Sequence, residues 1–409
     1  LNDLVSEYAP NIAEFLNTYP HIAQMVVTDD GVLYSVPFLR PALQPGDDWQ
    51  RYSVSPQLRL DWLEELGLEL PTTIAEWESV LEAFKQHKPE AYPFVADQVN
   101  GVRWFTGAFG INLDFYHVDG EVKYGAIQPE YKEYLTTMNR WYKKGLLDPD
   151  FMSTDYQRLR TLVLEERAGS YWGLLNRDMG GFTGLARARN PEFKLTSAPW
   201  PYYTDGNSYN FTPDGCFEFP GGGAAISSTN KHPVESMKWM DFWWSEEGLN
   251  LANFGIEGLT YNWTEDGFPQ YTDLIMKNPD GLSPVNALSS YTADGAGGRF
   301  WPQDARYWRQ MMALPEQYES GQRLANTGSA ARTIPPVTAT DREARELASI
   351  INEIDTYRDE MLAKFIMGIE PLDKFDEYVQ WMKRMGIDRA VELQQAALDR
   401  YQNRPIPTF

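Results

Sequence analysis

The sequence predicts an α/β protein made of two interleaved lobes, and three observations lead to this fold class. Capped amphipathic helices alternate along the chain with short apolar runs. The 409 residues are enough chain for at least two domains. No repeat, low-complexity tract or linker rich in proline, glycine and serine divides the sequence. We therefore expect lobes that exchange strands rather than domains arranged in series.

Helices are predicted where apolar residues recur at helical spacing between recognisable end signals. The clearest begins at Thr73, which can form a capping box with Glu76. The longest begins at Thr340, with Glu343 as its capping-box partner, and ends at Gly368. The other helices are expected at 129–145, 233–248, 373–385 and 388–401. The end of the chain is therefore rich in helices.

Strand candidates are short and lie between or before these helices. The apolar and β-branched runs that predict them are 31–37, 91–96, 168–173 and 223–227. Their length suits buried strands, and their alternation with helices supports the α/β class.

Charge and cysteine content exclude several classes of function. The sequence has 36 basic and 58 acidic residues, a net charge of −22, which argues against binding to nucleic acid or anionic lipid. The single cysteine, Cys216, allows no intramolecular disulfide, and we interpret it as a structural thiol. No apolar run reaches the length of about 18 residues that spans a membrane. The four histidines lack metal-ligand spacing: His21, His87, His117 and His232.

Motifs for catalysis and for cofactors are also missing. The glycines at 221–223 are not followed by the lysine of a P-loop, and they do not have the spacing of a dinucleotide-binding fingerprint. A stretch at 262–273 has some spacing of a calcium loop, but we interpret Asp266 and Gly267 as a β-turn. The sequence therefore predicts no cofactor, no metal and no catalytic residue.

Several spaced stretches carry a family resemblance. They are YSVPFLR at 34–40, QLRLDWLEELGLELPTTIAEWESVLEAFK at 57–85, ISSTNKHPVESMKWMDFWWSEEG at 226–248, NFGIEGLTYNW at 253–263, and the run 354–388. Together they resemble the extracellular solute-binding proteins (family 1) of carbohydrate ABC importers, in their lipoprotein branch. The chain is also distantly similar to maltose-binding protein.

The resemblance implies a type II periplasmic-binding-protein fold, in which crossing hinge strands join two lobes and the ligand lies between them. The crossovers are expected near 36–37 and 219–222. Residues 1–37 and 223–278 would form the N-lobe, and residues 38–222 and 279–409 the C-lobe with its helices. Family members usually carry an opening stretch and a lipid-anchor signal, so we expect both to precede Leu1 and the protein to be a cell-surface monomer. Some relatives have a calcium loop, but the corresponding run here, 86–91, has too few oxygen ligands.

Aromatic residues provide the candidate binding site. The chain has 14 Trp, 23 Tyr and 20 Phe, and aromatic faces pack on the C–H faces of sugar rings. Tryptophans at helical spacing are expected in the core: Trp62, Trp77, Trp141, Trp239 and Trp243. Loop aromatics and their polar neighbours are the predicted ligand contacts: Phe38, Arg40, Trp104, Phe105, Trp172, Asn176, Arg177, Trp200, Tyr202, Arg299 and Trp301. The similarity to maltose-binding protein implies stacking roles for Trp104, Trp172 and Trp301.

These observations predict a non-catalytic protein that captures an oligosaccharide and delivers it to an ABC permease. A glycosidase is the alternative, with Asp97 and Asp114 beside the Trp104 loop as its carboxylates. A sensor that signals instead of feeding a transporter is a third interpretation. The arginines beside the loops suit an acidic sugar, although we favour pairing with the protein's own carboxylates: Arg40, Arg103, Arg177 and Arg299.

Overall fold

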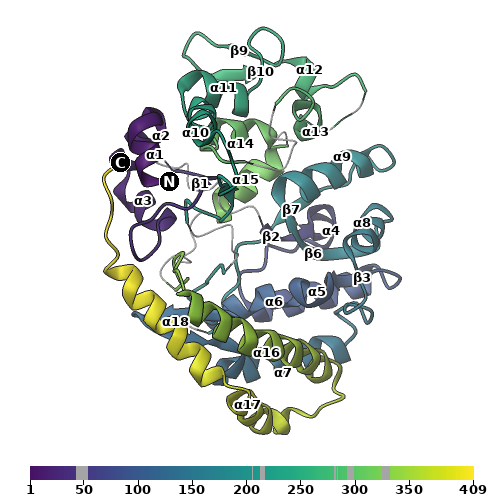
Figure 1. Ribbon diagram of the computed structural model, residues 1–409. Coiled ribbons are helices and arrows are strands. Elements are labelled where there is room, and N and C mark those ends of the chain that lie inside the picture. The colour runs from purple at the N-terminus through teal and green to yellow at the C-terminus, as the bar shows by residue number, and fades with distance from the viewer. Residues whose placement is uncertain are drawn as a thin grey trace.

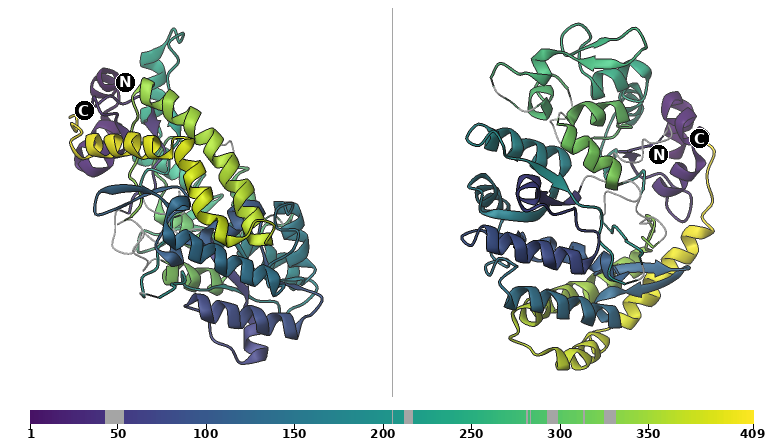
Figure 2. Two further views of the ribbon diagram at one scale, coloured as in Figure 1. Left: turned by 90° about the horizontal axis from the view of Figure 1, so that it is seen from below. Right: turned by 180° about the vertical axis from the view of Figure 1, so that it is seen from behind.

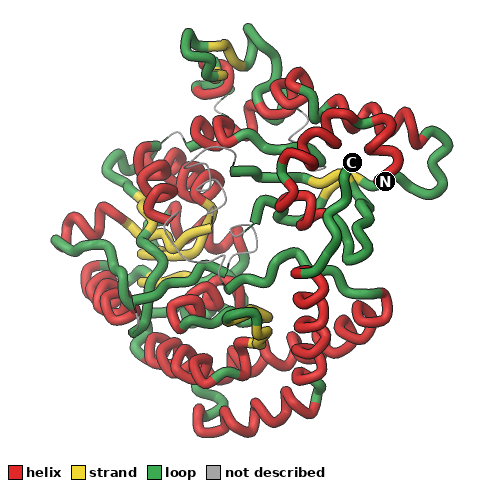
Figure 3. The backbone as a smooth tube through the Cα atoms, turned by 90° about the vertical axis from the view of Figure 1, so that its left-hand side faces the viewer, coloured by secondary structure: helices red, strands yellow, loops and turns green. Residues whose placement is uncertain are grey.

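The computed structural model describes residues 1–42, 54–204, 206–211, 217–280, 282, 284–292, 299–312, 314–324 and 332–409. Helices predominate and surround one main cluster of strands, while a smaller pair of strands lies near the two termini (Figure 3). The α/β class predicted from the sequence is confirmed. Cys216 lies outside the described residues.

A four-stranded sheet organises the larger part of the molecule. Its order is β3–β6–β2–β7, with β6 parallel to β3 and antiparallel to β2, and β7 antiparallel to β2. The strands are β2 (Val54–Arg59), β3 (Tyr92–Val95), β6 (Ala168–Leu174) and β7 (Leu195–Ser197). Of these, β3 and β6 were predicted, whereas β2 and β7 were not.

Helices pack around this sheet and form what we call the sheet core (Figure 1). They are α4 (Leu60–Leu66), α5 (Ile74–His87), α6 (Gln98–Arg103), α7 (Pro129–Lys143), α8 (Tyr156–Leu164) and α9 (Gly181–Arg187). The Thr73–Glu76 capping box of α5 is present, as predicted. Trp62, Trp77 and Trp141 are buried in this core, which confirms the prediction for these three indoles.

Shorter elements and the C-terminal helices complete this part. The short elements are the 3-10 helices η2 (Trp104–Phe109) and η3 (Gly125–Ile127), the hairpin β4 (Phe115–Val118) and β5 (Glu121–Tyr124), and the π-helical turn η4 (Leu175–Gly180). The C-terminal elements are α16 (Asp341–Met367), η7 (Leu372–Lys374), α17 (Phe375–Arg384) and α18 (Ile387–Gln402). The predicted capping box at Thr340 and the helix end before Gly368 are both confirmed.

A second set of buried residues, which we call the terminal core, comes from 1–39, 237–252 and 300–301. Its elements are α1 (Asn2–Tyr8), α2 (Pro10–Thr18), α3 (Pro20–Val26), β1 (Val36–Pro37), β8 (Gly223–Ala224), α10 (Pro233–Phe242) and α11 (Glu246–Asn253). Further elements connect it to the sheet: β9 (Tyr261–Trp263), β10 (Pro269–Tyr271), α12 (Asp273–Met276), α13 (Pro284–Leu288), α14 (Ala305–Met311) and α15 (Pro315–Leu324). The predicted turn at Asp266 and Gly267 joins β9 to β10.

Two predictions for the region 233–248 are wrong. A single helix was expected, but α10 ends at Phe242 and Ser245 caps a new helix by accepting a hydrogen bond from the Gly248 amide. Trp239 is not a core residue, since 55% of it is exposed. Trp244, five residues further along the chain, is buried instead, and its Nε1 donates to the Phe300 carbonyl at 2.7 Å. The restart of the helix changes which indole faces inward.

The chain passes between the two cores at a short pair of antiparallel strands. Val36 lies opposite Ala224 and Pro37 opposite Gly223, so the predicted strands 31–37 and 223–227 are each reduced to two residues. A Cβ on Gly223 would lie 2.3 Å from the Val36 carbonyl oxygen, so only glycine fits this crossing. The end of α18 also reaches α1–α3, and both termini lie there (Figure 2).

None of the helices in the described part of the chain combines the length and hydropathy needed to cross a bilayer.

Candidate functional site

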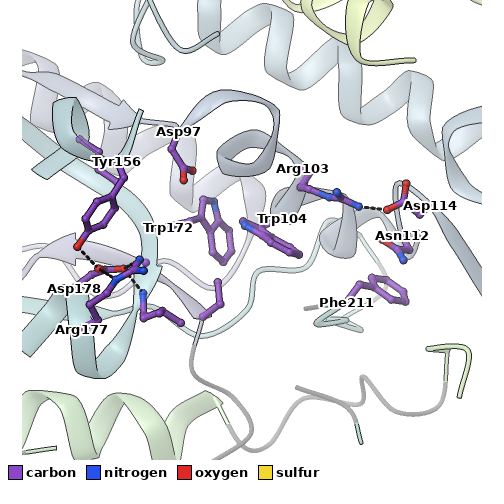
Figure 4. Close-up of a pocket in the computed structure, with 14 residues that line it drawn as sticks. Asp97, Arg103, Trp104, Asn112, Asp114, Tyr156, Trp172, Arg177, Asp178 and Phe211 are labelled. Carbon is purple, nitrogen blue, oxygen red and sulfur yellow. Dashed lines mark hydrogen bonds and ion pairs between the residues drawn. The ribbon is translucent and has the colours of Figure 1, made fainter. Parts of the chain in front are cut away.

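A pocket of about 440 Å³, which we call the sheet-edge pocket, opens beside the sheet (Figure 4). Its wall combines two indoles with several charged and polar side chains. The lining residues are Val54, Asp97, Arg103, Trp104, Asn112, Asp114, Tyr156, Leu159, Trp172, Gly173, Leu174, Arg177, Asp178 and Phe211.

The topology of the sheet explains why these side chains meet. Strands β3 and β6 are parallel, so their carboxyl ends lie at the same edge of the sheet. Asp97 follows β3, and Trp172 lies near the end of β6. Ligands of open α/β sheets bind outside the carboxyl ends of the strands, because the connecting loops diverge there. A Cβ on Gly173 would lie 3.0 Å from Asp178 Oδ2, so this glycine allows η4 to fold back onto the strand.

The two indoles form the apolar part of the wall. Trp172 is only 4% exposed and packs edge-on against Phe105, with the ring centroids 5.2 Å apart. Its other neighbour is Trp200, at 5.0 Å. Trp104 is half-buried, and the Arg103 guanidinium lies 5.5 Å from its ring. Trp172 is thus fixed from behind, while Trp104 presents more of its surface to the pocket.

One end of the pocket holds an arginine–aspartate ion pair joined by two hydrogen bonds. Arg177 Nε and Nη2 donate to the two carboxylate oxygens of Asp178 at 2.6 and 2.9 Å. The Asp178 carboxylate also accepts from the Tyr156 hydroxyl at 2.9 Å and from the Leu174 amide at 2.7 Å. The Arg177 guanidinium lies 4.4 Å from the Tyr156 ring, so the pair is held from several directions.

The other end holds Asp114 between two arginines. One of its carboxylate oxygens accepts from Arg103 and the other from Arg358 on α16. Arg358 also pairs with Asp355 at 2.8 Å and donates to the Tyr124 hydroxyl at 3.0 Å. In Figure 4, Trp172 and Trp104 lie between this pair and the Arg177–Asp178 pair.

Asp97 is the remaining acid of the pocket. Burial raises the pKa of its carboxyl to about 6, and the negative charge of Asp178 adds to the shift while Arg177 opposes it. In the described part of the chain, the Asp97 carboxyl accepts no side-chain hydrogen bond, and its own backbone amide supplies the one that lowers its pKa. This carboxyl is therefore available to a bound molecule.

The raised pKa predicts a specific pH dependence of stability. The folded protein holds the Asp97 proton more tightly than the unfolded chain, whose value is 3.8, so this stabilisation is complete below about pH 4 and is lost as pH rises through about 6. The substitution Asp97→Asn should remove this loss. From acid to neutral pH, the free energy of unfolding of wild type should fall by about 2–3 kcal/mol relative to that of the variant. Urea unfolding at both pH values measures the difference. The substitution Asp273→Asn at an exposed position should show the same pH dependence of stability as wild type. If the free energy of unfolding changes equally between the two pH values in all three proteins, the prediction is contradicted.

Of the predicted ligand contacts, the structure brings three to the pocket: Trp104, Trp172 and Arg177. Asn176 lies next to Arg177, but its Oδ1 accepts a hydrogen bond from the Arg177 amide. Trp200 lies behind Trp172 and is 3% exposed. The backbone of Tyr202 bonds to the residues that lead into α5. These three side chains support or flank the pocket and do not line it.

Two predicted contacts are buried in this structure. Phe105 is fully buried, with Trp77, Phe94, Trp141 and Trp172 edge-on around it, so it is a residue of the sheet core. Trp301 is 3% exposed and stacks on Trp243, with centroids 5.4 Å apart, in the terminal core. The expected group of Trp104, Trp172 and Trp301 is therefore not assembled here, because a loop position does not by itself place an indole at the surface.

The last three predicted contacts are Phe38 and Arg40, which follow β1, and Arg299, which lies much later in the chain. The guanidinium groups of Arg40 and Arg299 lie 5.6 and 5.4 Å from the Phe38 ring. These residues form a separate cluster that does not line the sheet-edge pocket. Sequence reasoning missed Asn112, Tyr156, Asp178 and Phe211 as lining residues. Only Asp178 carried a signal, since it follows Arg177 directly.

Other sites are limited within the described residues. There, no group of three or more histidine, cysteine, aspartate or glutamate side chains is placed to hold a metal ion. A second pocket, of about 400 Å³, lies between α2, α11 and α14, and its charged residues are Asp304, Arg306 and Arg309. We call it the Arg306 pocket. It lacks the paired indoles of the sheet-edge pocket.

Comparisons with known proteins agree with this architecture. FusA of Streptococcus pneumoniae serotype 4, a fructooligosaccharide ABC transporter substrate-binding protein, is 24% identical over 98% of this chain and 76% of its own. YtcQ of Bacillus subtilis, a polygalacturonan/rhamnogalacturonan-binding protein, is 22% identical over 92% of this chain and 73% of its own. The crystal structure of the alginate-binding protein AlgQ2 without calcium superposes with a TM-score of 0.75, at 25% identity, over 98% of this chain and 81% of that one.

The structure of FusA in complex with kestose superposes with a TM-score of 0.77, at 22% identity, and covers 98% of this chain and 83% of that one. The α/β fold is thus that of solute-binding proteins. The family model described as "Bacterial extracellular solute-binding protein" matches residues 44–249, which is half of the chain. The chain therefore belongs to the bacterial extracellular solute-binding proteins, a family that binds solutes and does not transform them.

Proposed function

We propose that this protein captures an oligosaccharide in the sheet-edge pocket and delivers it to the permease of an ABC importer. The observation that carries this proposal is the pairing of Trp104 and Trp172 in one pocket with an arginine–aspartate pair at either end. Indole faces pack against the C–H faces of sugar rings, and charged planar groups bond the hydroxyls at the rim.

The relatives support this substrate class. FusA is named for fructooligosaccharides, YtcQ for polygalacturonan and rhamnogalacturonan, and AlgQ2 for alginate. All three names describe carbohydrate polymers or fragments, both neutral and acidic. The pocket volume of about 440 Å³ lies within the usual range of small-molecule sites.

Closure of two lobes would complete the site. The β1–β8 pair is the candidate hinge, with residues 1–37 and 223–278 moving against 38–222 and 279–409. A ligand that contacts both lobes only when they are closed shifts the equilibrium toward the closed form, which the permease could then recognise.

The glycosidase alternative receives no support from the site. Its two candidate carboxyls do line the pocket, but Asp114 is held between two arginines, and Asp178, whose charge acts on Asp97, is itself paired with Arg177. Membership of a non-catalytic family points the same way. We further propose that the protein acts as a monomer outside the cytoplasmic membrane and is attached through a lipid anchor.

Calorimetric titration with a panel of oligosaccharides tests the function. We expect saturable binding of at least one oligosaccharide, and chromatography of the recovered sugar should show unchanged chain length. Binding should disappear for the corresponding monosaccharide, because a single ring cannot span both indoles and both ion pairs. Hydrolysis of the bound sugar, or no binding by any member of the panel, would refute the proposal.

A further inference from the structure

The charges of the sheet-edge pocket are already paired within the protein, and this bears on which sugar it selects. Arg177 donates two hydrogen bonds to Asp178, which is only 1% exposed. A ligand carboxylate that took over these donors would leave Asp178 buried without its cation. Breaking a buried ion pair in this way is strongly unfavourable.

The opposite end of the pocket behaves in the same way. Arg103 shares Asp114 with Arg358, whose side chain is 5% exposed and is surrounded by Asp114, Asp355 and Asp359. An acidic sugar placed here would face this group of carboxylates. The donors that remain on Arg103 and Arg177 suit hydroxyl groups, which bond to a paired guanidinium without displacing its partner.

Asp97 adds a third acid to the wall beside Trp172 (Figure 4). Its carboxyl has no side-chain partner among the described residues, so a ligand donor can satisfy it. The negative charge of the Asp97 carboxylate would repel the carboxylate of a uronate bound beside it. A positively charged amino sugar, in turn, would meet the guanidinium groups of Arg103 and Arg177 at both ends.

We propose that the sheet-edge pocket selects neutral oligosaccharides over uronate-containing ones, and that Asp97 accepts a hydrogen bond from a sugar hydroxyl as a specificity-determining residue. This inference rests on the proposed function and makes it narrower. It distinguishes the protein from relatives whose names refer to acidic polymers, such as polygalacturonan and alginate.

The test uses pairs of sugars that share a backbone and differ in charge. Oligogalacturonides are compared with their methyl esters, and oligomannuronides with manno-oligosaccharides, alongside neutral fructooligosaccharides. We expect the tightest neutral ligand to bind roughly tenfold or more tightly than any acidic one, the effect of one hydrogen bond to a charged group. If an acidic sugar binds as tightly as its neutral partner, the inference fails while the proposed function stands. If no sugar binds, both fail.

Variants separate the role of Asp97 from general effects on the fold. Asp97→Asn should weaken the neutral ligand roughly tenfold and reduce the discrimination against its acidic partner, because one acceptor and one negative charge are removed together. Arg389→Gln removes an exposed arginine–glutamate pair on α18, far from the pocket in sequence, and should leave both affinities within about twofold of wild type. Unchanged affinity and selectivity in Asp97→Asn would overturn the assignment of this residue.

Discussion

Truncation of Trp104 to alanine (Trp104→Ala) is expected to weaken oligosaccharide binding by roughly 30- to 100-fold. The indole is half-buried and lines the sheet-edge pocket, so it offers a sugar ring more apolar surface than the nearly covered Trp172. Loss of a buried aromatic anchor at the centre of a binding site commonly costs about 2–3 kcal/mol. Calorimetry with the sugar selected for the wild-type protein measures the change.

The matched control for this variant is Trp381→Ala. Trp381 lies on α17, is 53% exposed and is not among the residues that line the pocket. Its truncation should leave the affinity within about twofold of wild type, since solvent-exposed truncations away from a site change little. Equal losses in the two variants would mean that Trp104 acts through the fold and not through contact with the ligand.

Truncation of Arg404 is expected to have the largest effect on stability. Its side chain is fully buried, pairs with Asp29 at 2.9 Å, and donates to the carbonyl groups of Val27 and Gln24. It thereby fixes the end of the chain to the loop after α3, where the N- and C-termini lie together (Figure 2). Arg404→Ala removes this donor from the Val27 and Gln24 carbonyls and leaves Asp29 paired with Arg400 alone, so it should lower the free energy of unfolding by about 3 kcal/mol.

Urea unfolding of Arg404→Ala beside Arg389→Ala measures this contribution. Both arginines lie in the same C-terminal region, but Arg389 forms its ion pairs with Glu346 and Glu392 at the surface. The midpoint of Arg389→Ala should stay close to that of wild type, since exposed ion pairs add little. A midpoint of Arg404→Ala that also matches wild type would show that the buried cluster around Asp29 does not hold the terminal segment.

Local signals in the sequence predicted the two helices that begin with capping boxes, α5 and α16. The capping boxes at Thr73 and Thr340 involve residues three apart, so sequence spacing alone determines them. Strand β2 was missed for the opposite reason. It buries Ser55, Gln57 and Arg59, and a polar residue is interpreted as exposed until its partner is known. Ser55 pairs with Ser197 of β7 at 2.7 Å, and Arg59 pairs with Glu166 at 2.8 Å, so tertiary structure explains the burial.

The lining of the candidate pocket was predicted in part. Trp104 and Trp172 were selected as aromatics outside helical stripes, and both line the pocket. The same criterion selected Trp301, which is buried in the terminal core, because loop residues can also pack inward. The contribution of Tyr156 depends on how α8 approaches the end of β6 and left no local signal in the sequence. The charge balance of the pocket likewise appears only once Arg103 and Arg177 are seen beside Asp114 and Asp178.

A crystal structure of the protein grown with the tightest-binding oligosaccharide would show directly where the ligand lies. We expect an intact sugar in the sheet-edge pocket, with one ring against Trp104 and hydroxyls bonded to Asp97 and to the two arginine–aspartate pairs. Density for the sugar in the Arg306 pocket, with the space beside Trp104 and Trp172 left empty, would contradict it.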